Sequence, residues 1–165
     1  MKKLSIIIPV YNEFNTVSIV LHKLKKLTLP ENYTSQLLVV DDNSNDGSKE
    51  LLKKLESSEI FKNNIFIYKN KNLGKGDSQK VAIPLCEGDF TVIQDADLEY
   101  NIENISSLLE LAIKNKHDAV LGYRKLKDTK IYSAYFIFHK IAVLSLSFLT
   151  NILYLTRLKD VCTCY

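Results

Sequence analysis

The chain has 165 residues, of which 46% are hydrophobic and 25% are charged, a composition ordinary for a soluble globular protein. This length predicts one domain over residues 1–165 with a sizeable buried core. The net charge of +3 arises from lysines interspersed with acidic residues, which argues against a nucleic-acid-binding protein. The three cysteines lack zinc-ligand spacing and are odd in number, which indicates a reducing cytosolic compartment rather than a disulfide-bonded scaffold.

Apolar residues follow two different spacings along the chain. The run "LSIIIPV" at 4–10 predicts a strand buried on both faces, and apolar residues between positions 14 and 27 recur at helical spacing. Further strands are expected at 37–40, 65–68, 90–94 and 119–122, and further helices around 51–55, 74–86 and 102–115. Strands that alternate with helices predict an α/β fold with a mainly parallel sheet.

Residues 131–155 form a long apolar segment of a different kind. A membrane-spanning helix needs roughly 20 mostly apolar residues, so the length permits a span. His139 and Lys140 interrupt the segment, however, and a lysine near the centre of a span costs roughly 2.5–3.5 kcal/mol. We therefore expect a core helix, or a helix at a membrane interface, rather than a span.

Polar clusters follow the predicted strands. They lie at 11–13, 41–42, 70–76, 95–99 and 124. Ligands of open α/β sheets bind at the carboxyl ends of the strands, near a switch in strand order. The clusters are therefore expected to converge on one binding site.

Asp95, Asp97 and Glu99 place three carboxylates at alternate positions after the strand at 90–94. Carboxylate oxygens this close together suit Mg²⁺ or Mn²⁺, which in turn bind phosphate oxygens. A metal ion on a diphosphate neutralises the charge that develops on a leaving nucleotide. A solvated acidic loop is the alternative interpretation of the same three residues.

Five motifs, in this order, resemble those of glycosyltransferase family 2: "SIIIPVYNE", "LLVVDDNSNDGS", "NLGKG", "VIQDADLEY" and "VLGYR". The final "LTNILYLTRLKDVCTCY" is similar to a segment of its polyprenyl-phosphate branch, the dolichol-phosphate mannose synthase-like and undecaprenyl-phosphate glycosyltransferases. The resemblance implies a GT-A fold, the Rossmann-like nucleotide-diphospho-sugar transferase fold. Because such relatives continue beyond the point that matches Tyr165, we expect the catalytic domain to be truncated at its C-terminus.

The resemblance also implies roles for individual residues. Those matching nucleotide-binding positions are Pro9, Tyr11, Glu13, Asp41, Asp42, Gly74, Lys75, Asp95 and Ala96. Among them, Asp42 matches the carboxylate that accepts from the base, and Lys75 is placed to serve a phosphate. Asp95 and Asp97 match the metal and diphosphate site, with Glu99 as a third metal ligand. Arg124 matches the basic residue that binds the acceptor phosphate, so catalysis is expected to depend on Asp95, Asp97 and Arg124.

The activity implied is the inverting, metal-dependent transfer of a sugar from a UDP- or GDP-sugar to a polyprenyl (undecaprenyl or dolichyl) phosphate. The expected cofactor is Mg²⁺ or Mn²⁺, and the expected place is the cytoplasmic face of the membrane, with peripheral membrane contact and no nucleic-acid partner. Two alternatives stay open. One is a family 2 transferase that acts on a saccharide in cell-surface polysaccharide synthesis, and the other is an inactive nucleotide-binding paralogue or partner subunit.

Three residues depart from the family's pattern around the glycine-containing loop, namely Asp77, Ser78 and Lys80. Asp77 stands where that pattern has alanine, and its charge would repel a phosphate. Lys80 replaces an arginine, which exchanges a bidentate donor for a point charge. Asp77 favours the inactive alternative, whereas the intact Asp95 and Asp97 oppose it.

Overall fold

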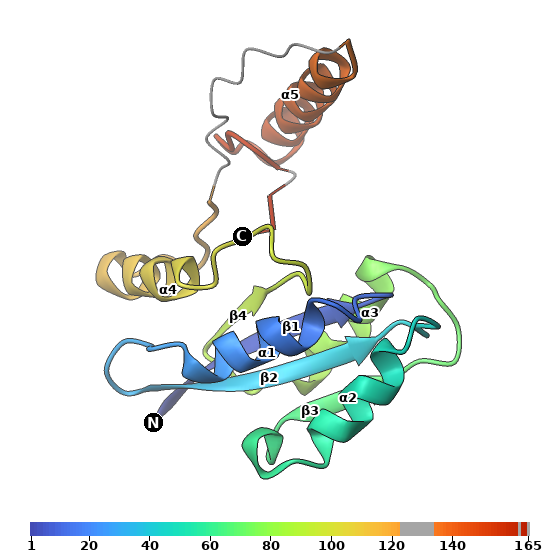
Figure 1. The fold of residues 1–165 in the computed structure, drawn as a ribbon. Helices are drawn as coiled ribbons and strands as arrows, with labels where there is room; N and C mark the ends of the chain where they lie inside the picture. Colours follow the sequence, from blue (N-terminus) through green and yellow to red (C-terminus); the bar gives the residue numbers. More distant parts are fainter. Residues whose placement is uncertain (123–133, 162, 165) are drawn as a thin grey trace. The chain divides into compact units, whose positions relative to one another are not determined.

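The computed structural model describes residues 1–122, 134–161 and 163–164, with the backbone alone for 134–140. The chain divides into two compact units, Met1–Lys116 and His117–Tyr165. The first unit contains a sheet of four parallel strands in the order β3-β2-β1-β4 (Figure 1). These strands are β1 (Lys2–Val10), β2 (Tyr33–Asp41), β3 (Ile65–Tyr68) and β4 (Phe90–Ile93). The α/β fold with a parallel sheet, predicted from the sequence, is confirmed.

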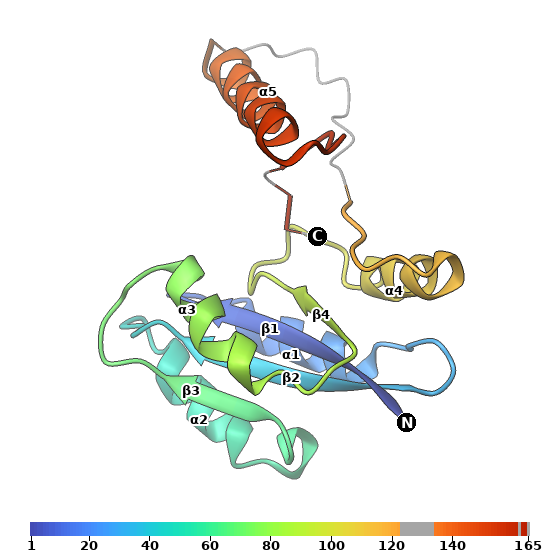
Figure 2. The ribbon, with the colours of Figure 1, turned by 180° about the vertical axis from the view of Figure 1, so that it is seen from behind.

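Helices cover both faces of this sheet. α1 (Val17–Lys26) and α2 (Ser48–Glu56) lie on one face and α3 (Lys75–Ala82) lies on the other, as the front and back views show (Figures 1 and 2). Because β1 is a central strand with layers on both sides, Ile6, Ile7 and Ile8 are all fully buried. Ile7 packs with Leu38 of β2 in a cluster that also contains Ala82 of α3.

The helix predicted over 74–86 is in fact two elements, α3 and a 3-10 helix, η2 (Ile83–Leu85). Pro84 has no N–H to donate to a carbonyl of the preceding turn, so α-helical hydrogen bonding stops and the chain continues after Ala82 as a 3-10 turn. Two other helices complete this unit, η1 (Glu59–Phe61) and α4 (Asn104–Asn115).

Buried hydrogen bonds fix the segment that leads into β4. The hydroxyl of Ser5 donates to Gln36 at 2.6 Å and accepts from the N–H of Gly88 at 2.9 Å. A side chain at Gly88 would bring a Cβ to 2.5 Å from the backbone nitrogen of Ser5, so glycine is needed at this approach. The bonds hold β4 in register beside β1, where Leu4 pairs with Phe90. They therefore determine where the residues after β4 emerge.

The second unit contains α5 (Ala134–Tyr154), within the predicted apolar segment. The residues after α5 fold back onto this helix. Oδ1 of Asn151 accepts from the N–H of Leu158 at 2.7 Å, and Oγ of Ser147 accepts from the N–H of Val161 at 3.2 Å. Among the described helices none is long and apolar enough to cross a membrane.

The prediction of a strand at 119–122 was wrong, because these residues form no strand in the structure. A strand exists only where a neighbouring backbone supplies its hydrogen bonds, and the described sheet ends at β4 with no further strand paired to it. A four-residue apolar run therefore does not by itself specify a strand.

Candidate functional site

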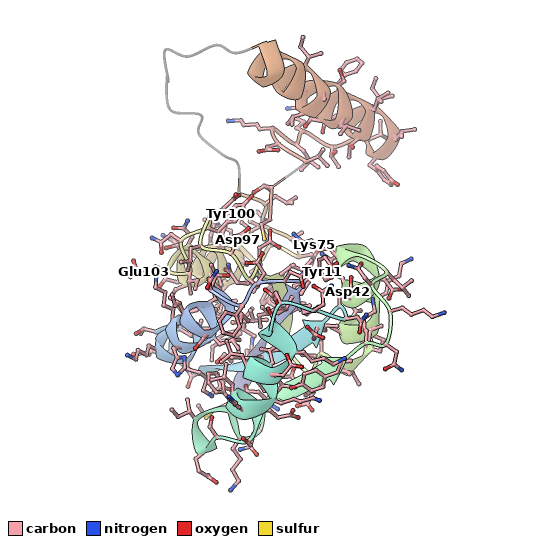
Figure 3. The ribbon with its side chains drawn as sticks, turned by 45° about the vertical axis from the view of Figure 1, so that its right-hand side comes forward. Tyr11, Asp42, Lys75, Asp97, Tyr100 and Glu103 are labelled. Atoms are coloured by element: carbon pink, nitrogen blue, oxygen red, sulfur yellow. The ribbon has the colours of Figure 1, made fainter. Side chains whose placement is uncertain are left out.

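A cavity of about 260 Å³ opens at the carboxyl ends of β1 and β4 in the first unit. It is lined by Pro9, Val10, Tyr11, Glu13, Asp42, Lys75, Ser78, Asp95, Ala96 and Asp97. Tyr11, Asp42, Lys75 and Asp97 gather at this end of the sheet (Figure 3). The strand order changes direction here, since β2 and β3 lie on one side of β1 and β4 on the other. The cavity therefore lies at the switch point where open α/β sheets bind ligands.

Hydrogen bonds join the loop after β1 to the loop after β2. The N–H of Asn12 donates to Oγ of Ser44 at 3.0 Å, and the N–H of Asn45 donates back to Oδ1 of Asn12 at 2.9 Å. The N–H of Glu13 donates to Oγ of Ser48, which is fully buried, at 2.9 Å. Tyr11 and Glu13 are thus held at the cavity by bonds from a separate loop.

Asp46 is the acceptor at the centre of these two loops. Its carboxylate accepts from the N–H of Phe14 at 3.0 Å and from the hydroxyl of Ser48 at 2.6 Å. Burial alone would raise the pKa of Asp46, but the hydrogen bonds from Ser48 and Phe14 outweigh burial and lower that pKa. The carboxylate therefore stays charged and keeps the loops joined at neutral pH.

Asp42 reaches the cavity from the end of β2, with only 3% of its side chain exposed. Its Oδ1 accepts from the N–H of Leu73 at 3.1 Å and its Oδ2 accepts from the N–H of Gly74 at 2.7 Å. Nζ of Lys69 lies 2.5 Å from Oδ1. Burial would raise the pKa of Asp42, yet Lys69 and the two backbone donors more than offset burial and lower it. Asp42 is thus a fixed anion at the wall of the cavity.

Lys69 also pairs with Asp77, whose Oδ2 lies 2.6 Å from Nζ. Asp77 is not among the residues that line the cavity. Burial would lower the pKa of Lys69, but the two carboxylates outweigh burial and raise it. The charge of Asp77, expected from the sequence to repel a phosphate, is instead matched by a buried ammonium.

The acidic segment after β4 contributes Asp95 and Asp97 to the cavity. Asp95 forms an ion pair with Lys75, and Oδ1 of Asp97 accepts from the N–H of Glu99 at 3.0 Å. Glu99 itself is exposed and lies outside the lining. The structure thus brings two carboxylates and one lysine to a single wall.

This donor set fits a divalent cation that shares its coordination with a ligand. Mg²⁺ is usually held by one or two carboxylates together with substrate phosphates and water rather than by a cage made of protein alone. Asp95 and Asp97 supply such a pair, while no group of three or more His, Cys, Asp or Glu side chains in the described residues could hold a metal ion. The two carboxylates are therefore suited to an ion that completes its coordination with water and with oxygens of a ligand.

Most of the predicted site residues line this one cavity. Those at its wall are Pro9, Tyr11, Glu13, Asp42, Lys75, Asp95, Ala96 and Asp97, whereas Asp41, Gly74 and Glu99 are not part of the lining. Asp41 is fully buried, and its carboxylate accepts from the N–H of Ser44 at 3.3 Å. Arg124 falls outside the described residues.

Sequence reasoning missed Ser78 and Lys69. Ser78 is fully buried and lines the cavity from the first turn of α3. Lys69 directly follows β3, so the rule that polar residues at strand ends meet at one edge would have included it. The predicted polar cluster began at Asn70, one residue too late.

Comparison with known proteins identifies the family of the chain. Residues 5–157 match the family model described as "Glycosyl transferase family 2". The chain belongs to glycosyltransferase family 2.

Named members of glycosyltransferase family 2 are similar to most of this chain. The "Dolichol-phosphate mannosyltransferase" of Pyrococcus furiosus is 33% identical over 129 residues, which cover 78% of this chain and 35% of the relative. The "Undecaprenyl-phosphate 4-deoxy-4-formamido-L-arabinose transferase" of Pseudomonas fluorescens is 32% identical over 119 residues, or 72% of this chain and 33% of the relative. Both names contain a polyprenyl phosphate, as the predicted branch of family 2 requires. The chain spans about a third of the length of these relatives.

Solved structures support the same fold. TarS of S. aureus in complex with UDP-GlcNAc has a TM-score of 0.57 at 26% identity. The match covers 70% of this chain and 32% of the TarS chain. The mannosyltransferase PcManGT from Pyrobaculum calidifontis, solved with GDP-Man and Mn²⁺, has a TM-score of 0.58 at 20% identity. The match covers 66% of this chain and 32% of the PcManGT chain. The predicted GT-A fold is confirmed.

Proposed function

We propose that the chain binds a nucleotide sugar in the cavity at the β1–β4 switch point and belongs to a glycosyltransferase that transfers the sugar to a polyprenyl phosphate. The proposal rests on the residues that form the cavity wall. Asp42 supplies a fixed hydrogen-bond acceptor, and Lys75, Asp95 and Asp97 supply the charges that a metal-bound diphosphate requires. TarS, a structural neighbour at 26% identity, contains UDP-GlcNAc, which supports a nucleotide sugar as the ligand.

Each wall residue has a distinct task in this proposal. Asp42 accepts an N–H of the base, since its carboxylate is charged and immobile. Asp95 and Asp97 hold one Mg²⁺ or Mn²⁺ ion, which when bound supplies Lewis-acid stabilisation of the leaving diphosphate. Lys75 changes from its ion pair with Asp95 to a contact with a phosphate oxygen when a second anion enters the cavity.

The acceptor assignment rests on the relatives, whose names specify dolichol phosphate and undecaprenyl phosphate. A lipid monophosphate is an anion and attacks without a strong general base, so the site needs cations rather than a base. Arg124 is predicted to bind this phosphate. Inversion at the anomeric carbon, location at the cytoplasmic face and peripheral contact with the membrane belong to the same proposal.

The test is transfer of label by the full-length protein. Labelled UDP- and GDP-sugars are incubated with polyprenyl phosphate in detergent, with Mn²⁺ or with a chelator, and the lipid phase is counted. We expect label in the lipid phase only with Mn²⁺, and no transfer by Asp95→Asn. Asp89→Asn is the matched control, because Asp89 is exposed and precedes β4 at the opposite end of the strand. Label that enters a water-soluble saccharide would support the alternative acceptor, and no transfer at all would overturn the proposal.

A further inference from the structure

The acceptor capacity of Asp42 is almost used up before any ligand binds. A carboxylate offers about four lone-pair positions, two on each oxygen. On Oδ1 one position receives the N–H of Leu73 at 3.1 Å, and Nζ of Lys69 lies 2.5 Å from the same oxygen. On Oδ2 one position receives the N–H of Gly74 at 2.7 Å. One position, on Oδ2, is left for a further donor.

Lys69 prevents a second hydrogen-bond donor from reaching Oδ1 of Asp42. Only 9% of its side chain is exposed, and it lies between Asp42 and Asp77, so it cannot turn to solvent without leaving two buried or half-buried carboxylates unpaired. Its Nζ meets no acceptor at a good hydrogen-bond angle among the described residues, so the contact is an ion pair rather than an aligned hydrogen bond. An ammonium group 2.5 Å away nevertheless excludes a second donor from that side of Oδ1.

The bases of the two common nucleotide sugars present different edges to a carboxylate. Guanine offers two adjacent donors, N1–H and N2–H₂, which a free carboxylate accepts with one oxygen each. Uracil offers one donor, N3–H, between two carbonyl oxygens. An acceptor with a single open position satisfies the one N–H of uracil but leaves one guanine donor without a partner, which weakens binding of the GDP-sugar by about tenfold or more.

We propose that Lys69 determines the base specificity of this site: by occupying one oxygen of Asp42, it leaves an acceptor for one N–H and so selects a UDP-sugar over a GDP-sugar. The inference rests on the proposed function, because it requires the base to lie against Asp42. Asp77 takes part by holding Lys69 in place, which gives this departure from the family pattern a role in the site.

The test is a calorimetric titration of the full-length protein with UDP and with GDP, both in the presence of Mn²⁺. We expect UDP to bind at least about tenfold more tightly than GDP. Lys69→Met keeps an unbranched side chain of similar length but removes the charge, and it should bring the ratio of the two dissociation constants close to one. The control is Lys71→Met, which removes an exposed lysine from the same loop and should leave the ratio unchanged.

The ratio is the informative quantity, because general damage to the loop would weaken UDP and GDP alike. Equal binding of the two nucleotides by the unaltered protein, or tighter binding of GDP, would overturn the base selectivity while leaving the proposed function intact. A preference for UDP that persists in Lys69→Met would assign the selectivity to another residue. If neither nucleotide binds, the proposed function itself fails, and the inference fails with it. The comparison in the unaltered protein stands even if Lys69→Met does not fold.

Discussion

Oδ1 of Asn12 accepts a hydrogen bond from the N–H of Asn45 at 2.9 Å, so one side chain after β1 anchors the backbone of the loop after β2. Asn12 has a φ of 57°, in the left-handed region that asparagine adopts more readily than other residues with a side chain. The same residue thus provides the turn that presents Tyr11 to the cavity and the bond that fixes the turn in place.

Asn12→Ala is expected to loosen both loops. It removes the acceptor for Asn45 and places alanine at a left-handed position, which together should cost about 1–2 kcal/mol of the free energy of unfolding. Urea denaturation measures this loss. Asn15→Ala, at an exposed position three residues further on, is the control and should change the midpoint little. Equal midpoints for the two variants would show that the bond between the loops is of no consequence.

Asp97→Asn is expected to weaken metal-dependent nucleotide binding without unfolding the protein. Asparagine keeps an oxygen that can accept from the N–H of Glu99 but removes the negative charge. We expect the affinity for UDP in Mn²⁺ to fall by about tenfold or more, with stability changed by less than about 0.5 kcal/mol. Calorimetry with and without Mn²⁺ gives the first quantity and urea denaturation the second.

Glu99→Gln tests the predicted third ligand in the same experiment. Glu99 is exposed and outside the cavity lining, so we expect its replacement to change the affinity by no more than about twofold, the range of ordinary surface substitutions. A loss as large as that of Asp97→Asn would show instead that all three carboxylates hold the ion. Full metal-dependent binding by Asp97→Asn would refute the metal site altogether.

Gly47→Ala and Gly76→Ala are expected to change stability in opposite directions. Gly47 has a φ of +98°, and a Cβ there would lie 3.1 Å from the ring of Phe14, so alanine should cost about 1–2 kcal/mol. Gly76 lies in α3 with no atom within 4 Å of its Cβ position, so alanine should stabilise the protein by up to about 1 kcal/mol. Thermal unfolding of both variants checks the signs, and a stabilised Gly47→Ala would contradict the requirement for glycine.

The fold was predictable from the sequence where burial alone dictates the residue types. The isoleucines of β1 are apolar at successive positions because helices cover both faces of the sheet, and that pattern identifies a central parallel strand. The run at 119–122 is also apolar, but it pairs with no strand of the described sheet. A four-residue apolar pattern does not specify which strand, if any, it pairs with. The sequence therefore indicated the class of fold better than the number of strands.

The lining of the cavity was predictable where a motif has its own chemistry, as with Asp95 and Asp97. Lys69 belongs to no such motif, and only its place directly after β3 could have included it. Its role depends on two carboxylates, Asp42 and Asp77, which only the folded chain brings within 2.6 Å of its Nζ. For the same reason, Asp77 appeared in the sequence as an unmatched charge, although its partner lies eight residues earlier.

The ion pairs of Lys69 predict a characteristic dependence of stability on pH. The folded-state pKa of Asp42 is lowered, so its contribution is present above the unfolded pKa of about 3.9 and is lost as the pH falls through the folded value. The folded-state pKa of Lys69 is raised, so its contribution is present below the unfolded pKa of about 10.4 and is lost as the pH rises through the folded value. Both contributions are therefore complete between about pH 5 and pH 9.

Lys69→Met isolates this dependence. We expect a constant difference between the unfolding free energies of the unaltered protein and the variant from about pH 5 to pH 9. This difference should become smaller below about pH 5 and above about pH 9. On the acid side Asp42 becomes protonated and no longer needs a cation, and on the alkaline side Lys69 loses the charge that the variant lacks. Urea denaturation across the pH series gives the difference, with Lys71→Met as the control. A difference that does not vary with pH would mean that Lys69 stabilises the loop by packing and that its charge has no effect.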